Sequence, residues 1–199
     1  MAEIFALASY NKSSSVYLDP RAQLLCVLEG QKGGITQIEF SPDGTKLLAG
    51  GRKDNEILIW DMRNPGSLYA VLNRQIDTNQ RVYFDIESNG RYVFSGSTDG
   101  SLSVWDLNKN ISSENNGLLD RLAHFPNMHL DAVNGCSLHP YLPYLATSSG
   151  QRHVDFPMIS DDEDVEDNKS EDGDFKMSQE ENTLKLWSFE PMRHDEIQD

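Results

Sequence analysis

Cysteine is scarce in this 199-residue sequence. Its only two cysteines, Cys26 and Cys136, cannot form a disulfide framework, and no C-x-x-C pair is present to suggest a zinc site. Disulfides are frequent in secreted proteins and rare in cytosolic and nuclear ones. The sequence therefore favours a reducing compartment, the cytosol or the nucleus, over secretion.

Long apolar runs are absent as well. No stretch approaches the roughly 18 apolar residues that a membrane-spanning helix needs. The first residues, Met-Ala-Glu-Ile-Phe-Ala-Leu-Ala, include an acid and no basic residue, and only five apolar residues follow one another. A signal peptide has a basic region and a longer apolar one. We expect neither a leader peptide nor a membrane partner.

Sequence patterns of catalytic sites are also missing. We find no phosphate-binding loop, nucleophile elbow or metal-ligand spacing. His139 precedes Pro140 at an expected turn, and Cys136 lies in an expected buried strand, so we do not expect a nucleophile–base pair there. The sequence predicts no catalytic residue, no metal and no cofactor, and hence a protein that is not an enzyme.

Negative charge is abundant but concentrated. The net charge is −15, and residues 160–182 alone contain eleven acidic and two basic residues. Residues 1–159 contain seventeen acidic and thirteen basic residues, so this part is only mildly acidic. The overall charge therefore says little about the partner of the folded part. The acidic segment, placed at about 154–182, lacks an apolar pattern, and we expect it to be disordered.

Two Trp-Asp pairs, Trp60-Asp61 and Trp105-Asp106, stand 45 residues apart. Each ends a strand-like run: residues 56–60 form a short apolar run, and residues 101–105 alternate polar and apolar. Upstream of each pair, Asp-Gly or Asn-Gly follows an apolar run, with the two glycines 46 apart. These dipeptides are strong tight-turn signals, because glycine adopts positive φ without steric cost. The sequence thus predicts a repeating unit of short strands.

Each unit predicts four strands. The expected ranges are 35–40, 46–50, 56–61 and 68–72 in the first full unit, and 81–86, 92–96, 101–107 and 118–124 in the second. A third unit has strands at 133–138 and 144–148, and a Leu-x-Leu-Trp strand resumes at Thr183–Ser188, beyond the acidic insertion. Upstream, the ranges 4–10, 16–19 and 24–28 resemble the last three strands of an earlier unit.

The expected fold is all-β: a partial WD-repeat β-propeller of about three and a half blades. Residues 1–30 hold the last strands of a preceding blade, and 31–76 and 77–127 are blades. Residues 128–190 form an interrupted blade, and 191–199 a tail. Because the chain begins within a blade and closure is what removes open sheet edges, we expect a fragment, a truncated sequence or a short isoform.

Eight residues occupy positions that WD repeats use for structure. They are Trp60, Asp61, Trp105, Asp106, Asp54, Asp99, His129 and Trp187. A buried Trp needs a partner for its N–H, and in WD repeats that set includes a His before the first strand and an Asp in the tight turn. His129 holds the His position, which Gln31 and Asp77 occupy in the earlier units. We interpret these residues as structural.

Several strings are not required by the strand pattern. They lie in the segments 33–36, 51–63, 78–86, 96–106 and 134–152. The strings Arg-Lys-Asp, Thr-Asn-Gln-Arg and Ser-Gly-Gln-Arg, in this order and spacing, resemble those of the telomerase Cajal body protein 1 family. The resemblance covers residues 3–152, and the acidic insertion with its later strand is also similar. Family members have a disordered N-terminal region and a complete propeller, so this chain departs from them by lacking half a ring.

The resemblance implies a nuclear, Cajal-body protein. Members of that family bind small Cajal-body RNAs and telomerase RNA and deliver them to Cajal bodies, which supports telomere maintenance. Partners would include box H/ACA ribonucleoproteins, and no DNA partner is expected. The alternative is a generic WD-repeat scaffold that binds proteins and has no RNA role.

Candidate RNA contacts are basic or aromatic residues in loops, because unstacked bases pack on rings and guanidinium planes while Lys and Arg hold phosphates. The candidates are Arg52, Lys53, Arg81, Tyr83 and Arg152. Arg81 and Arg152 are favoured because blade geometry requires neither. The alternative for each is an ordinary surface residue paired with a carboxylate.

Two serines in the acidic insertion precede acidic residues, as in sites of acidophilic kinases. They are Ser160 and Ser170. Phosphate there would add negative charge to a segment that already repels RNA. The alternative is that this segment is only a solvated loop extension.

Overall fold

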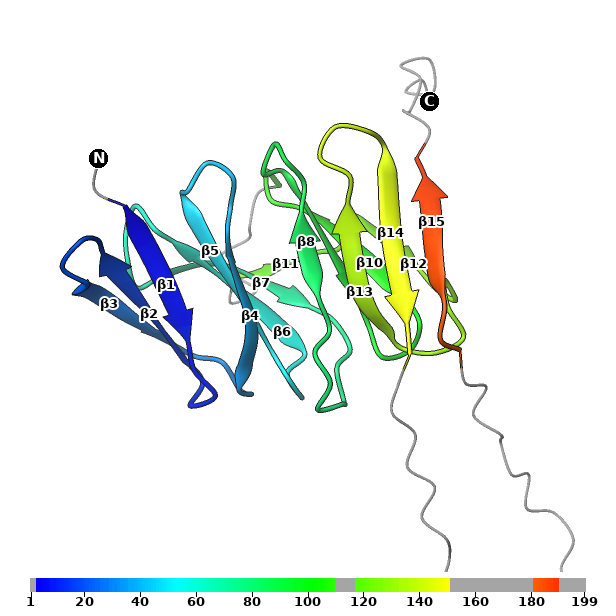
Figure 1. The fold of residues 1–199 in the computed structure, drawn as a ribbon, viewed down its shortest axis with the longest axis horizontal. Coiled ribbons are helices and arrows are strands. Elements are labelled where there is room, and N and C mark those ends of the chain that lie inside the picture. The colour runs from blue at the N-terminus through cyan, green and yellow to red at the C-terminus, as the bar shows by residue number, and fades with distance from the viewer. Residues whose placement is uncertain (1–2, 110–116, 151–180, 190–199) are drawn as a thin grey trace, which may run out of the picture.

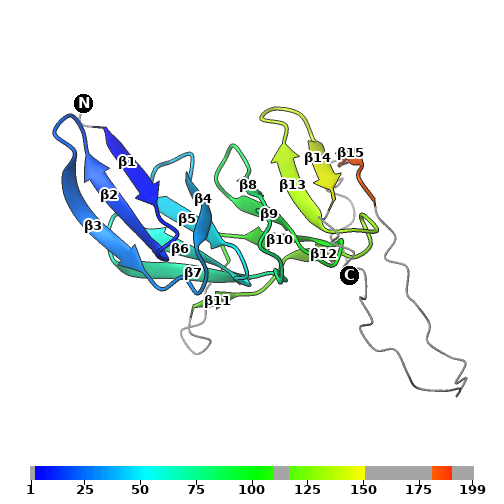
Figure 2. The same ribbon diagram turned by 60° about the horizontal axis from the view of Figure 1, so that its bottom comes forward.

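The computed structural model describes residues 3–109, 117–150 and 181–189 (Figure 1). All regular elements in these residues are β-strands, fifteen of them, arranged in four sheets. No helix in the described ranges is long and apolar enough to cross a membrane. The four sheets follow one another in chain order and lie face to face (Figure 2), as blades do around a propeller axis. The all-β expectation is confirmed: the described chain forms part of a β-propeller.

The first sheet contains three strands and the second contains five. The first consists of β1 (Ile4–Ala8), β2 (Ser13–Leu18) and β3 (Gln23–Glu29). The second consists of β4 (Ile35–Phe40), β5 (Lys46–Gly51), β6 (Glu56–Asp61), β7 (Ser67–Asn73) and β11 (Leu118–Leu119). Neighbouring strands are antiparallel, except that β11 runs parallel to β7.

The third and fourth sheets complete the arc. The third consists of β8 (Phe84–Ile86), β9 (Tyr92–Gly96), β10 (Leu102–Asp106) and β12 (Ala123–Phe125). The fourth consists of β13 (Val133–Leu138), β14 (Tyr144–Ser149) and β15 (Leu184–Ser188). The strand expected at Thr183–Ser188 is β15, which pairs antiparallel with β14 from Tyr144↔Ser188 to Ser148↔Leu184. The chain therefore returns to this sheet after the acidic segment.

Apolar side chains fill the contacts between sheets. Trp105 is completely buried, and it belongs to a cluster of eleven buried residues between the second and third sheets. Trp60 lies between the first and second sheets with Val16, Leu28, Leu47 and Leu58. Alternation along the strands explains this arrangement, because every second side chain points to the same face of a sheet.

Side chains of the inner strands also bond to the backbone of the neighbouring inner strand. The Gln37 amide donates to the Phe84 carbonyl (2.8 Å) and accepts from the Phe84 N–H (3.0 Å), so it joins β4 to β8. The Asp85 carboxylate accepts from the Leu138 N–H (2.6 Å), which joins β8 to β13. These side chains satisfy backbone N–H and carbonyl groups that in the middle of a sheet would bond to a further strand.

Several predicted strands are wrong in their extent. The range 4–10 ends at Ala8, the range 16–19 is Ser13–Leu18, and two further ranges differ in their pairing as well. Residues 118–124 do not form one strand: Leu118–Leu119 join the second sheet as β11, while Ala123–Phe125 pair with β10 as β12. The range 81–86 contains a strand only from Phe84, because the Tyr83 N–H donates to the Asn134 carbonyl of β13 (2.9 Å) and not to β9. The expected disorder of the acidic insertion concerns residues outside those described, except for 181 and 182, and the tail at 191–199 lies outside them altogether.

Candidate nucleic-acid interface

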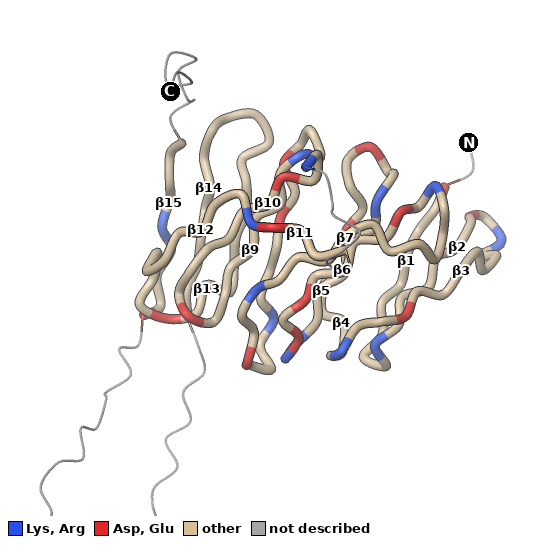
Figure 3. Tube along the Cα trace, turned by 180° about the vertical axis from the view of Figure 1, so that it is seen from behind, with Lys and Arg blue, Asp and Glu red and all other residues tan. Residues whose placement is uncertain are grey.

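Four loops meet at one edge of the arc, the lower edge in Figure 1. They comprise residues 9–12, 30–34, 52–55 and 74–83, and together we call them the loop edge. Backbone hydrogen bonds join them: Ile35 N–H donates to the Ser9 carbonyl (3.3 Å) and Lys53 N–H to the Thr78 carbonyl (3.1 Å). Lys and Arg positions gather along this edge below β4 and β5, with acidic positions among them (Figure 3). Basic groups from separate loops are thus brought together.

Arg52 stacks on a tyrosine that comes from the first sheet. Its guanidinium carbon lies 4.4 Å from the centre of the Tyr10 ring. Two glycines make this contact possible: a Cβ on Gly33 would lie 1.9 Å from the Arg52 carbonyl oxygen, and one on Gly34 would lie 2.6 Å from the Tyr10 ring. The Gly-Gly string therefore has a steric cause, the close approach of three loops.

Lys53 and Asp54 share this turn but differ in exposure. Lys53 is exposed and has a φ of 47°, an uncommon conformation for a residue with a side chain. Asp54 is buried, and its carboxylate accepts from the N–H groups of Lys32 (2.8 Å) and Gly33 (3.0 Å). Asp54 therefore fixes the loop before β4, and the Lys53 ammonium is left to face solvent.

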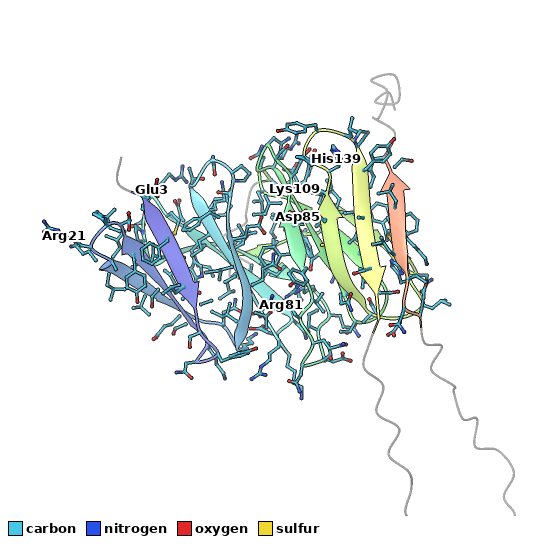
Figure 4. The ribbon with its side chains drawn as sticks, viewed as in Figure 1. Glu3, Arg21, Arg81, Asp85, Lys109 and His139 are labelled. Carbon is cyan, nitrogen blue, oxygen red and sulfur yellow. The ribbon has the colours of Figure 1, made fainter. Side chains whose placement is uncertain are left out.

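Arg81 forms a second guanidinium–ring pair on the same edge (Figure 4). Its guanidinium carbon lies 5.3 Å from the centre of the Tyr83 ring, and Nη1 donates to the Tyr83 hydroxyl (2.9 Å). Both side chains are exposed, Tyr83 by 41%. Since β8 begins at Phe84, both residues lie on the loop and not in the sheet.

Arg74 holds that loop in place, and the sequence analysis missed it. Its side chain is buried, and Nη1 donates to the Val82 carbonyl (3.0 Å) and the Ser95 hydroxyl (2.9 Å). Nε and Nη2 have no hydrogen-bond partner among the described residues. Burial lowers the pKa of Arg74 to about 10, so it stays protonated at neutral pH. No local signal identifies it, because its partners lie in a distant strand and a loop carbonyl.

The third Trp of the repeat has a complete hydrogen-bond network. Trp187 Nε1 donates to the Thr147 hydroxyl (2.8 Å), which also bonds His129 Nε2 (2.7 Å). His129 Nδ1 bonds the Thr183 hydroxyl (3.1 Å). Burial, with Lys185 nearby, lowers the pKa of His129. Trp105 differs, because its buried Nε1 has no partner in the described ranges. In the unit that contains Trp60, Gln31 holds the His position and donates to the Ala49 carbonyl (3.0 Å).

The Asp of each Trp-Asp pair bonds an arginine of its own sheet. Asp61 pairs with Arg63 (2.7 Å), whose hydrogen bonds lower the pKa of Asp61 to about 2, and Asp106 pairs with Arg91 (2.8 Å), which also lowers its pKa. Asp99 closes its turn by accepting from the Ser101 N–H (3.0 Å). These partners place the three acids in local turn structure. Arg152, Ser160 and Ser170 lie outside the described residues.

The arrangement of side chains on the loop edge is suited to base stacking and phosphate contact.

Cys136 and His139 lie in different surroundings. Cys136 is buried, burial raises its pKa to about 12, and its Sγ contacts the Tyr83 carbonyl (3.3 Å). His139 Nδ1 accepts from backbone N–H groups of the following loop, and no recorded hydrogen bond joins it to Cys136. The described residues contain no group of three or more His, Cys, Asp or Glu side chains placed to hold a metal.

Comparison with known proteins gives the same architecture. The family model "WD domain, G-beta repeat" matches residues 22–61 and 79–106. With the sheets described above, these matches define the chain as a WD-repeat β-propeller protein.

Particular relatives are more informative. The chain is similar to telomerase Cajal body protein 1 of Mus musculus (42% identity over 160 residues, 80% of this chain and 30% of the relative) and of Homo sapiens (42% over 163 residues, 82% and 29%). It is also similar to the homolog of Drosophila melanogaster (42% over 132 residues, 65% and 22%). The chain belongs to the telomerase Cajal body protein 1 family. It spans about 30% of the length of the mouse relative.

Proposed function

We propose that this chain is the part of a non-enzymatic WD-repeat scaffold that contacts single-stranded RNA through its loop edge. The scaffold directs small Cajal-body RNAs and telomerase RNA to Cajal bodies in the nucleus and so supports telomere maintenance. The names of the relatives support the link to telomerase and the Cajal body. Box H/ACA ribonucleoproteins as partners rest on the family resemblance. No DNA, membrane or cofactor has a part in this function.

The division of the chain into blades belongs to the same proposal. The four sheets support blades at 31–76, 77–127 and 128–190, preceded by blade strands within 1–30. Only β11 crosses a proposed boundary, because it lies within 77–127 in the sequence and in the second sheet by its hydrogen bonds.

The observation that carries the RNA proposal is the pair of guanidinium–ring stacks. Arg52 on Tyr10 and Arg81 on Tyr83 hold four planar groups on adjoining loops, where a base can stack on an outer face. Lys53 stands exposed between them in the sequence and supplies a charge for phosphate. Preformed stacks lose little side-chain freedom when a base arrives.

The test compares two double variants of equal charge. Arg52→Ala with Arg81→Ala removes both stacks, whereas Arg21→Ala with Lys109→Ala removes two exposed cations away from the loop edge (Figure 4). Affinity for a fluorescent single-stranded loop of a small Cajal-body RNA is measured by anisotropy at several salt concentrations. Stacking contributes about 1–3 kcal/mol per base, so we expect the first variant to bind at least about tenfold more weakly and the second to bind like the parent. Equal losses in both variants would disprove the site.

A further inference from the structure

A pocket opens between the third and fourth sheets, at the edge opposite the loop edge, where Figure 4 labels His139. Its volume is about 470 Å³, within the range of ligand-binding pockets. Most of its walls are apolar. They include Tyr92, Phe94, Val104, Leu122, Phe125 and Leu142. Three of these remain substantially exposed: Leu122 (45%), Phe125 (41%) and Leu142 (52%). Contiguous exposed apolar side chains around a hollow mark an interaction surface.

The corresponding space between the second and third sheets is filled, which shows what chemistry fits. Leu107 stands two residues after Trp105, as Phe189 stands two after Trp187. Leu107 is buried in the large apolar cluster together with Leu119 of β11, whereas Phe189 lines the open pocket. The space between the third and fourth sheets therefore lacks a strand that corresponds to β11.

β11 is a two-residue strand that lies parallel to the outer strand β7, with Leu118 opposite Val71 and Leu119 opposite Leu72. The Val71 N–H donates to the Gly117 carbonyl (2.8 Å) at its start. The outer strand of the third sheet, β12, has no such added strand among the described residues. Residues 190–199 contain no leucine and no two adjacent aliphatic residues. They therefore lack a Leu-Leu pair like the one in β11 that fills the space between the second and third sheets.

Two polar groups define the rest of the pocket. One carboxylate oxygen of Glu87 is buried and has no hydrogen-bond partner in the described part of the chain. His139 Nδ1 accepts from the N–H groups of Tyr141 (3.1 Å) and Leu142 (2.9 Å), so in the neutral ring the proton is on Nε2, a donor. Among the described residues that line the pocket, Glu87 is the only Asp, Glu, Lys or Arg, so a cation complements it.

We propose that this pocket binds an extended segment of a partner protein in which two leucine-like residues adjoin an arginine or lysine. The segment adds along β12 as β11 adds along β7. Its apolar side chains fill the space against Phe125 and Leu142, and its basic side chain pairs with Glu87. Backbone pairing supplies affinity and the pocket supplies specificity, as in other cases of strand addition. The proposal does not depend on RNA binding at the loop edge.

The test uses the full chain and three synthetic peptides, monitored by the methyl resonances of Val104 and Leu122. The peptides are acetyl-Gly-Arg-Leu-Leu-Gly-amide, the same peptide with Glu for Arg, and the same with Ser-Ser for Leu-Leu. We expect the first to bind and to shift both methyl sets, and the other two to bind at least about tenfold more weakly.

Protein variants locate the contact. Leu142→Glu should weaken binding about tenfold, whereas Leu130→Glu, at an exposed leucine outside the pocket lining (67% against 52% for Leu142), should not. Glu87→Gln should remove the preference for Arg over Glu while the Leu-Leu requirement remains. The proposal is overturned if no peptide shifts the pocket resonances, as it would be if the chain's own residues after Phe189 or a second copy filled the space. Equal effects of Leu130→Glu, or displacement of the peptide by single-stranded RNA, would overturn it as well.

Discussion

Two contacts flank the third sheet, and they differ in how they are held. Toward the second sheet, eleven buried residues form one apolar cluster, and Tyr69 seals it by donating to the Leu107 carbonyl (2.8 Å). Toward the fourth sheet, the cluster formed by the described residues has three buried members, Leu102, Cys136 and Leu145, with partly buried neighbours. Because apolar stabilisation scales with the area removed from water, the first contact gains far more from it.

Side-chain hydrogen bonds cross both contacts. Gln37 binds the Phe84 backbone across the first, and Asp85 binds the Leu138 backbone across the second. Within the fourth sheet, the Trp187–Thr147–His129 network adds order. Such bonds add little net stability each, but a buried partner left unsatisfied is costly. The comparison teaches that the two contacts share polar bonds between their strands and differ in apolar burial, and that the contact with less apolar burial is the one that leaves room for a ligand.

The largest expected effect tests the apolar contact. Trp105→Ala removes a fully buried side chain and should lower the free energy of unfolding by about 3–5 kcal/mol. Trp187→Ala removes a partly exposed one and should cost clearly less. Urea unfolding followed by far-ultraviolet circular dichroism measures both. If Trp187→Ala were the more damaging change, the fourth sheet would be held more tightly than its cluster indicates.

A pair of glycines sharpens the comparison at the backbone. A Cβ on Gly96 would lie 2.0 Å from the Val133 carbonyl oxygen, in the contact between β9 and β13. A Cβ on Gly50 would lie 2.9 Å from Nη2 of Arg74, a side-chain nitrogen without a hydrogen-bond partner among the described residues, and not from backbone. Overpacking typically costs about 1–3 kcal/mol, and we expect Gly96→Ala at the upper end and Gly50→Ala at the lower. Thermal unfolding of the two variants checks the order, which reversed values would contradict.

The smallest effect is a pH dependence of stability that arises from His129 in the fourth sheet's hydrogen-bond network. The folded chain holds the pKa of His129 below its usual 6.5, because burial and Lys185 outweigh Glu181. The unfolded chain therefore binds a proton more readily, and stability that is full above pH 6.5 should fall as the pH drops below it. The urea midpoint should decrease between pH 7.5 and 5.5 by less in His129→Gln than in the parent. Equal slopes would show that His129 does not titrate differently on folding.

The spacing of apolar residues and the tight-turn dipeptides predicted most of the fold. The run 56–61 is β6 and the run 133–138 is β13, because both combine an apolar pattern with a bounding turn. The range 118–124 was wrong, since Leu118 and Leu119 pair with a strand more than forty residues away and Arg121 donates to the Asn73 carbonyl (2.9 Å). Local sequence does not encode which sheet a short apolar segment joins.

The candidate site was predicted in part. Residue type and loop position identified Arg52, Lys53, Arg81 and Tyr83, and their role in RNA binding stays a prediction. The stack of Arg52 on Tyr10 could not be found, because it joins loops of two sheets and depends on the close approach at Gly33 and Gly34. These glycines carried the signal, since adjacent glycines before a strand indicate that another backbone comes close.

Strand β11 makes the second and third sheets mechanically dependent on each other. It follows β10 in the chain but is hydrogen-bonded to β7, so β7 and β12 are tied by a short span of residues. In repeat proteins each repeat contacts only its neighbours, so the unfolding of one repeat usually exposes only the surface of the adjoining one. Here, pulling the third sheet away also strips an edge strand from the second. We therefore expect the second and third sheets to unfold as one unit, about twice the length of the repeat in the sequence.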